Sequence, residues 1–250
     1  MLNMLNRNKN AAYLILKLIQ GGICSMQIKN FLDIFVIADE IYQYLEDKEI
    51  KFDEEGFPVF TREMFLTEWP DLVIPFSQRK NRRVINRSRT VVCFFDKDQK
   101  LYPRISKVLS EIEEYKTFMG AIGLDITITE DMDDEWQRAI ALINQLFLAV
   151  LAVNGIKIII NTRAGGLASE IIFKNIPQDV MAASGFLGCD GLKQENDFSY
   201  LEKILMLLPN KLIIYGKHDL TVEKQLDVMG IDYRVYTDFH RLCKEVRYGR

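Results

Sequence analysis

Residues 122–161 read IGLDITITEDMDDEWQRAIALINQLFLAVLAVNGIKIIIN, and this stretch decides the fold class. Two runs rich in β-branched residues, 122–128 and 156–161, flank a long apolar segment. That segment starts in an acidic cluster, which suits the positive end of a helix dipole, and stops at Asn154-Gly155, where glycine can end a helix. Two strands joined by a buried helix are expected to lie parallel in one sheet, because the crossover returns the chain in the same direction.

The same alternation of strand and helix patterns runs from Thr90 to the end of the chain. Strands at 156–161 and 211–215 are apolar without alternation, as a sheet covered on both faces requires, whereas the last strand alternates polar and apolar residues and suits an edge. We therefore predict an α/β fold with a mostly parallel open sheet and helices on both faces. A TIM-like barrel, closed through a strand near Leu72–Ile74, is the alternative. The other predicted strands are Thr90–Phe95, Val180–Gly185 and Asp232–Tyr236.

The first part of the chain has a different pattern. Helical periodicity predicts helices at Ala11–Gln20, Phe31–Glu46 and Thr61–Thr67, separated by a glycine pair and an acidic loop. We expect a helical N-terminal region over residues 1–70 and an α/β domain of repeated βα units over residues 71–250.

Composition excludes several classes of protein. With 250 residues, 48% hydrophobic content and a net charge of −3, the chain is neither disordered nor uniformly basic. Its four cysteines form no C-x-x-C pair, which is typical of a reducing compartment, and we expect a cytoplasmic protein. The longest apolar segment, residues 139–153, is too short to span a bilayer and indicates a core helix, so no membrane association is expected.

Five segments, taken in order, resemble an uncharacterised domain-of-unknown-function family found in Gram-positive bacteria, their phages and other mobile elements. The segments are Ile74–Ser77, Val91–Asp96, Asp125–Thr127, Asn154–Ile159 and Ile213–Gly216. The resemblance covers about residues 72–216 and implies a provenance, since the family carries no established activity. One departure is the strand end Asn161-Thr162-Arg163, where the family pattern has a proline followed by a tryptophan.

Ligands of such sheets bind at the carboxyl ends of the strands, and Asp125 is the most specific candidate there. We expect it mid-strand, on one face with Gly123 and Thr127. A carboxylate in a buried strand needs a partner: either Arg163, Lys157 or a backbone amide satisfies it, or it serves catalysis. In the second case Asp125 and Asp96 act as acid or base, or Asp96, Asp98 and Asp125 bind Mg²⁺ for phosphodiester chemistry. No other cofactor is indicated.

Two further strand ends offer weaker candidates. Gly165 and Gly166 either present amides to a phosphate or only make a tight turn. His218, after a predicted strand, is a candidate general base, although a turn residue before the next helix is the commoner role. His240 lies in the final helix pattern and is expected to be a surface or packing residue.

The segment 79–89 is the most concentrated signal, with six positive charges and no acid. Its cations are Arg79, Lys80, Arg82, Arg83, Arg87 and Arg89. They suit the phosphates of nucleic acid, although the acidic runs Glu46–Glu55 and Glu130–Glu135 are competing intramolecular partners, and a solvated linker is a third alternative.

The function favoured by the sequence is therefore that of a phage or mobile-element accessory protein that binds DNA, RNA or a host or phage protein through this segment. The alternatives are a metal-assisted phosphodiester or nucleotide enzyme, and a non-catalytic nucleotide-binding or small-molecule-binding domain, each with a site at the strand ends. The oligomeric state is open.

Overall fold

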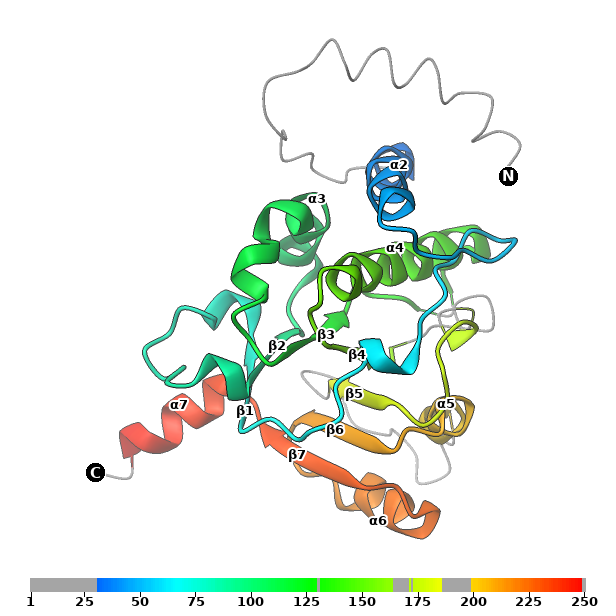
Figure 1. The fold of residues 1–250 in the computed structure, drawn as a ribbon. Coiled ribbons are helices and arrows are strands. Elements are labelled where there is room, and N and C mark those ends of the chain that lie inside the picture. Colours follow the sequence, from blue (N-terminus) through cyan, green and yellow to red (C-terminus); the bar gives the residue numbers. More distant parts are fainter. Residues whose placement is uncertain (1–30, 130, 164–170, 172, 186–198, 249–250) are drawn as a thin grey trace.

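The computed structural model describes residues 31–129, 131–163, 171, 173–185 and 199–248, and they form a seven-stranded, all-parallel sheet (Figure 1). The strands lie side by side in chain order. Their bounds are β1 Leu72–Pro75, β2 Thr90–Phe94, β3 Gly120–Leu124, β4 Ile158–Asn161, β5 Met181–Gly185, β6 Lys211–Gly216 and β7 Tyr233–Thr237. The helices are α2 Phe31–Asp47, α3 Asp98–Tyr115, α4 Asp134–Val153, α5 Ser199–Leu207, α6 Leu220–Met229 and α7 Phe239–Tyr248.

The predicted α/β class and the parallel sheet are confirmed, and the sheet curves until it is nearly a barrel. β1 and β7 are its two edges, as expected for the last strand. Side chains bridge the two edges: the Tyr236 hydroxyl donates to the carbonyl oxygen of Pro70 at 2.8 Å, and the Arg234 guanidinium lies 4.7 Å from the centre of the Trp69 ring. The sheet is therefore intermediate between the open form and the closed barrel.

Strand side chains alternate between two cores. Cys93, Ile159 and Ile213 belong to a small core on the concave face, whereas their neighbours Phe94, Ile160 and Ile214 belong to a larger one on the convex face. The buried apolar residues of α3, α4, α5 and α6, except Ala139, lie in this larger core, and none lies in the small one. We expected helices on both faces, but α3, α4, α5 and α6 all pack on one face of the sheet. Parallel strands in chain order give this result, because crossovers of one hand return the chain over the same face.

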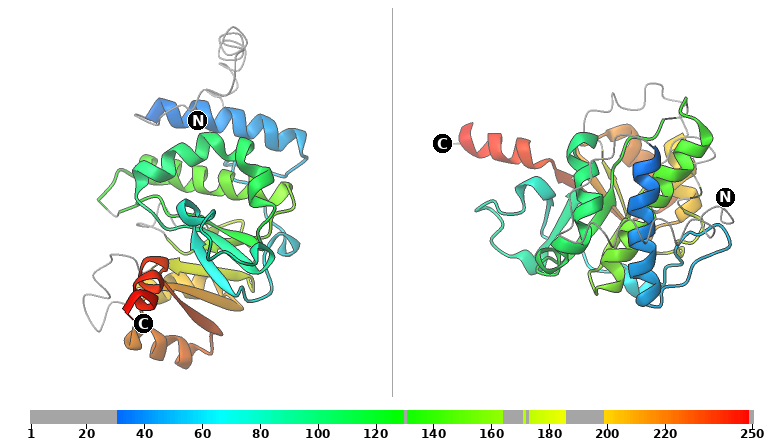
Figure 2. Two further views of the ribbon diagram at one scale, coloured as in Figure 1. Left: turned by 90° about the vertical axis from the view of Figure 1, so that its left-hand side faces the viewer. Right: turned by 90° about the horizontal axis from the view of Figure 1, so that it is seen from above.

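Helix α4 is buried on two sides, which explains its apolar sequence. It lies between the sheet and α2 (Figure 2). The side chain of Asp133 caps it by accepting from the amides of Glu135 and Trp136. Among the helices of the described residues, α4 alone is long and apolar enough to cross a membrane. However, 78% of its most apolar 18-residue stretch is buried inside the protein.

The N-terminal predictions have mixed outcomes. The helix expected at Phe31–Glu46 is α2, and the one expected at Ala11–Gln20 lies outside the described residues. The helix expected at Thr61–Thr67 is wrong, since only a 3₁₀ turn forms at Arg62–Met64. After it, Phe65 pairs alongside Ile158, and Phe65 and Leu66 enter opposite cores. Side chains that point alternately to opposite sides are typical of an extended chain. Burial of Phe65 and Leu66 in the two cores therefore outweighs the weak helical periodicity of this segment.

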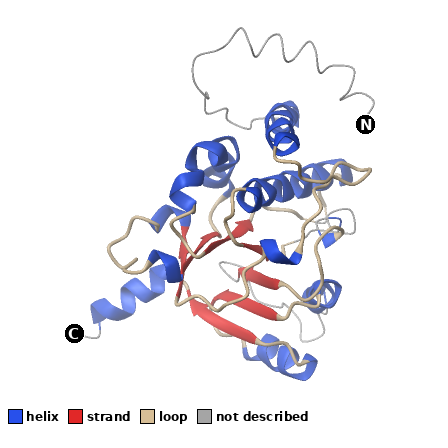
Figure 3. Cartoon of the chain, viewed as in Figure 1, coloured by secondary structure: helices blue, strands red, loops and turns tan. Residues whose placement is uncertain are grey.

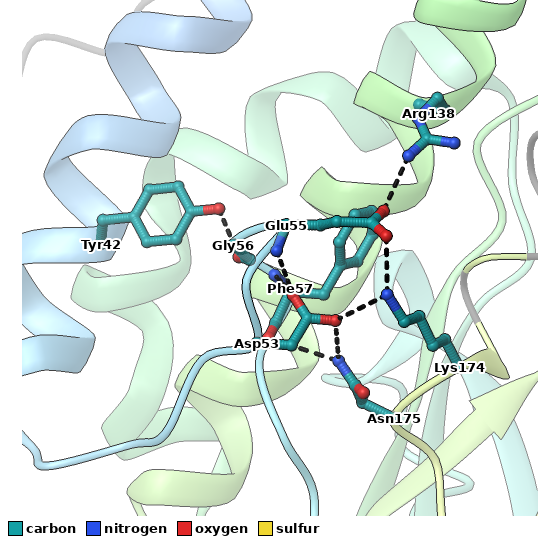
Figure 4. A network of polar contacts seen from close by, with 8 residues as sticks. All are labelled: Tyr42, Asp53, Glu55, Gly56, Phe57, Arg138, Lys174 and Asn175. Carbon is teal, nitrogen blue, oxygen red and sulfur yellow. Dashed lines mark hydrogen bonds and ion pairs between the residues drawn. The ribbon is translucent and has the colours of Figure 1, made fainter. Parts of the chain in front are cut away.

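A polar network fastens the acidic loop to the rest of the fold (Figure 4). One oxygen of Asp53 accepts from the amides of Glu55 and Phe57, and the other accepts from the side chain of Asn175 at 2.8 Å. Glu55 pairs with Lys174 and with Arg138 of α4, each at 2.7 Å. These acids are therefore matched to cations other than those of segment 79–89.

Candidate functional site

A pocket of about 660 Å³ opens at the carboxyl ends of the strands. Its lining comes from the residues that end or follow β1, β2, β3, β4, β6 and β7, so segments distant in the sequence meet there because the strands are parallel. The lining residues are Pro75, Phe95, Asp96, Lys97, Asp98, Gln99, Asp125, Thr127, Arg163, Tyr215, Asp238 and His240.

Asp125 reaches this pocket because β3 carries one extra residue. Ala121 pairs with Val92 but Leu124 pairs with Phe94, so three residue steps on β3 match two on β2. This bulge ends the strand at Leu124 and places Asp125 just beyond it. The expected mid-strand position, on one face with Gly123, is therefore wrong: a Cβ on Gly123 would contact Leu148 of α4, whereas Asp125 lines the pocket.

The strand end Asn161-Thr162-Arg163 holds the Asp125 carboxyl. Nδ2 of Asn161 donates to Oδ1 of Asp125 at 3.0 Å and to the carbonyl oxygen of Leu124 at 2.9 Å. Nη1 of Arg163 lies 3.3 Å from Oδ2 of Asp125. The amide of Arg163 in turn donates to Oδ1 of Asn161. Asn161 and Arg163, two residues of this strand end, thus orient Asp125.

Burial dominates the electrostatics of Asp125. It raises the pKa of this carboxyl to about 6, against the opposing effects of Arg163 and Asn161, and nearby Asp98 adds to the rise. A side chain with a pKa in this range exchanges its proton near neutral pH. Asp125 is therefore the residue of the pocket best suited to act as an acid or base.

Asp96 and Asp98 line the same pocket but are engaged locally. The Lys100 ammonium lies 2.9 Å from Oδ1 of Asp96. Oδ1 of Asp98 accepts from both the amide and the hydroxyl of Thr127 at 3.1 Å. Across the described ranges no group of three or more His, Cys, Asp or Glu side chains is placed to hold a metal ion. The three carboxylates expected to bind Mg²⁺, Asp96, Asp98 and Asp125, are therefore not grouped in that way.

Of the two histidines, His240 lines the pocket and His218 does not. His218 is 70% exposed, is hydrogen-bonded to Glu223 at 3.0 Å and does not line the pocket. His240 does line it, at the start of α7, where Asp238 accepts from its amide. Sequence reasoning missed His240, although the rule that directs attention to strand ends applies equally to residues 238–240, which follow β7.

An aromatic wall completes the pocket. The rings of Phe95 and Tyr215 stack with centroids 5.5 Å apart. The Tyr215 hydroxyl accepts from the amide of Phe239 at 3.0 Å, which fastens the first turn of α7 beside the pocket. The predicted phosphate-binding glycines, Gly165 and Gly166, lie outside the described residues.

The basic segment is largely held within the fold, and among the described residues its ion-pair partners lie outside both acidic runs. Arg79 and Lys80 lie 3.0 and 3.5 Å from Glu114, and Arg89 pairs with Glu68 and Asp71. Arg83 donates to the carbonyl oxygen of Leu242 and Arg87 to the hydroxyl of Thr117, while Arg82 is exposed.

No family model matches the chain, and no curated protein and no solved structure is similar to it. The family resemblance noted from the sequence stays a prediction.

Proposed function

We propose that the protein binds a small polar molecule in the pocket at the strand ends and that Asp125 transfers a proton to or from it. The observation that carries the proposal is the placement of Asp125: its side chain is 15% exposed, lines the pocket and is oriented by Asn161 and Arg163. The pocket volume falls within the range of about 300–1,000 Å³ typical of small-molecule sites.

The surrounding side chains have complementary roles in this proposal. Arg163 gives one guanidinium nitrogen to Asp125 and keeps other N–H donors for a ligand, since its side chain is 31% exposed. Phe95 and Tyr215 are only 3% and 0% exposed, so their stacked rings support the pocket wall from the core behind it. Because both protonation states of Asp125 are populated near pH 6, the carboxyl can donate or accept a proton in mildly acidic to neutral solution.

A defined ligand panel tests the proposal. Sugars, sugar phosphates, amino acids and nucleotides are each added to the protein, thermal shifts identify binders, and mass spectrometry follows their turnover. We expect at least one binder whose turnover is lost in Asp125→Asn while its binding is kept. The pH dependence of turnover should show an ionisation near 6 in the wild type.

Asp47→Asn is the matched control, because it removes an exposed carboxylate outside the pocket. It should turn the ligand over like the wild type. Turnover that survives in Asp125→Asn at the wild-type rate would contradict the catalytic role of Asp125. A ligand whose binding is unaffected by Arg163→Ala would bind outside this pocket.

A further inference from the structure

The loop 79–89 and helix α7 form one projecting surface beside β1. The loop connects β1 to β2 and extends from the body of the protein, with α7 next to it (Figure 1). Figure 3 shows the same loop in tan above the C-terminal helix. Nη1 of Arg83 donates to the carbonyl oxygen of Leu242 at 3.2 Å and joins the two elements.

The arginines of the loop divide into anchors and an exposed remainder. Arg79 is only 16% exposed, because its guanidinium meets Glu114 and the carbonyl oxygen of Phe76. Arg87 lies over the Phe118 ring at 5.1 Å, and Arg89 bonds to residues 68–71. These contacts fix the loop backbone. The most exposed cations of the loop are Lys80, whose side chain is 73% exposed, and Arg82.

The surface keeps a net positive charge after its internal ion pairs are formed. Three of the six loop cations, Arg79, Lys80 and Arg89, meet three carboxylates, Glu114, Glu68 and Asp71. Three positive charges of the loop therefore stay unbalanced. Along α7 the sequence adds Arg241, Lys244 and Arg247 against Glu245, and Arg241 pairs with Asp238 at the helix start. Because the whole chain has a charge of −3, this end of the molecule is strongly polarised.

We propose that the loop 79–89 and α7 together bind the sugar-phosphate backbone of a nucleic acid, with Lys80 and Arg82 as direct phosphate contacts. The anchored arginines hold the loop in place before binding, which lowers the entropy lost when phosphates are engaged. A lipid surface fits less well, since membrane binding needs a larger apolar area than Ile85, the only large apolar side chain on the loop that is exposed (92%), supplies.

Salt dependence of binding tests the surface directly. Labelled single-stranded RNA, single-stranded DNA and duplex DNA of 30 nucleotides are titrated with the full chain between 50 and 200 mM salt by fluorescence anisotropy. We expect affinity for at least one of them to fall with salt. In K80A/R82A the affinity at 50 mM salt should drop about tenfold or more, and the slope of log affinity against log salt should shrink by about 1.5, because two phosphate contacts are lost.

K51A/K224A is the matched control, since it removes two exposed lysines from the acidic loop and α6. It should bind like the wild type, and so should Asp125→Asn, which separates this surface from the pocket. The proposal is overturned if the wild type binds none of the three nucleic acids, if K80A/R82A matches K51A/K224A, or if only phosphatidylserine vesicles or an acidic protein are bound.

Discussion

Nη1 of Arg163 lies 3.3 Å from Oδ2 of Asp125, and this ion pair joins the ends of two neighbouring strands, β4 and β3. Attraction to Arg163 lowers the pKa of Asp125, but burial raises it more, and the balance is a value of about 6. Water reaches the pair from the pocket, since the Arg163 side chain is 31% exposed. The pair therefore does not hold Asp125 permanently ionised, and a carboxyl that exchanges its proton remains at the pocket wall.

The first prediction concerns the pH dependence of stability. The folded pKa of about 6 exceeds the ordinary value of 3.8, so between these pH values the folded state binds the proton more tightly than the unfolded chain. Asp125 thus contributes stability that is fully present below pH 3.8 and is lost as the pH rises through 6, on the order of 3 kcal/mol. The unfolding free energy of the wild type minus that of Asp125→Asn should fall accordingly from pH 4 to pH 7 in urea titrations.

Asp125→Glu supplies the control for that experiment, because it keeps a titrating carboxyl at this position. Its pH profile should keep the wild-type direction, although a longer side chain changes the size of the effect. A difference between the wild type and Asp125→Asn that stays constant across this pH range would show that burial does not govern the ionisation of Asp125.

Much of the fold follows from local patterns. Unalternated apolar runs such as 211–215 and the all-round apolar segment 139–153 predict buried parallel strands and a doubly covered helix, and both are observed. The face that the helices occupy depends on the order of the strands in the sheet. That order depends on contacts between segments far apart in the sequence, so the hydrophobic periodicity of a single segment does not predict it.

The site was predictable only in part, for the same reason. The rule that ligands bind at strand ends correctly selects Asp96, Asp98, Asp125 and Arg163 as neighbours. The bulge in β3 that turns Asp125 into the pocket could not be predicted, because residues 122–129 alternate apolar residues with glycine or polar ones, as a regular strand does. The pairing of Arg79 with Glu114 depends on the packing of α3, which charge counts along the sequence do not capture.

The second prediction concerns Asp53, whose contribution to stability changes with pH in the opposite direction to that of Asp125. Burial alone would raise the pKa of Asp53, but hydrogen bonds from Asn175, Phe57 and Glu55, together with the charge of Lys174, outweigh it and lower the pKa. Asp53 therefore contributes stability that is present above pH 3.8 and is lost as the pH falls below that value. Asp53→Asn should lose about 1–3 kcal/mol at pH 7 in urea unfolding.

Glu54→Gln is the control for Asp53→Asn, because Glu54 is an exposed acid next to it. It should change stability by less than about 0.5 kcal/mol. If both variants behave alike, the network of Figure 4 does not fasten the acidic loop.

The third prediction uses a glycine to disturb the aromatic wall. A Cβ on Gly185 would lie 2.7 Å from Cδ1 of Phe95, so Gly185→Ala must move a ring that stacks on Tyr215. We expect a loss of about 1–3 kcal/mol in chemical unfolding and weaker binding of any pocket ligand. Gly123→Ala is the control on the opposite face, where the nearest atom, 3.2 Å away, belongs to the flexible side chain of Leu148. If Gly185→Ala and Gly123→Ala affected ligand binding equally, Phe95 would have no specific role in the site.

The last prediction tests whether Asn161 positions Asp125. Asn161→Ala removes the side-chain hydrogen bond that lowers the pKa of Asp125, and it leaves the carbonyl oxygen of Leu124 and the amide of Arg163 without their partner. We expect a loss of about 2–3 kcal/mol in unfolding free energy. The titration of Asp125, monitored by carboxyl ¹³C NMR, should move to higher pH.

Thr162→Val separates the two effects, because it removes a buried hydrogen bond of 2.6 Å to Ser184 that does not touch Asp125. It should lower stability and leave the titration of Asp125 in place. A titration that is unmoved in Asn161→Ala would leave Arg163 as the side chain that lowers the pKa of Asp125, and would make Asn161 a purely structural residue.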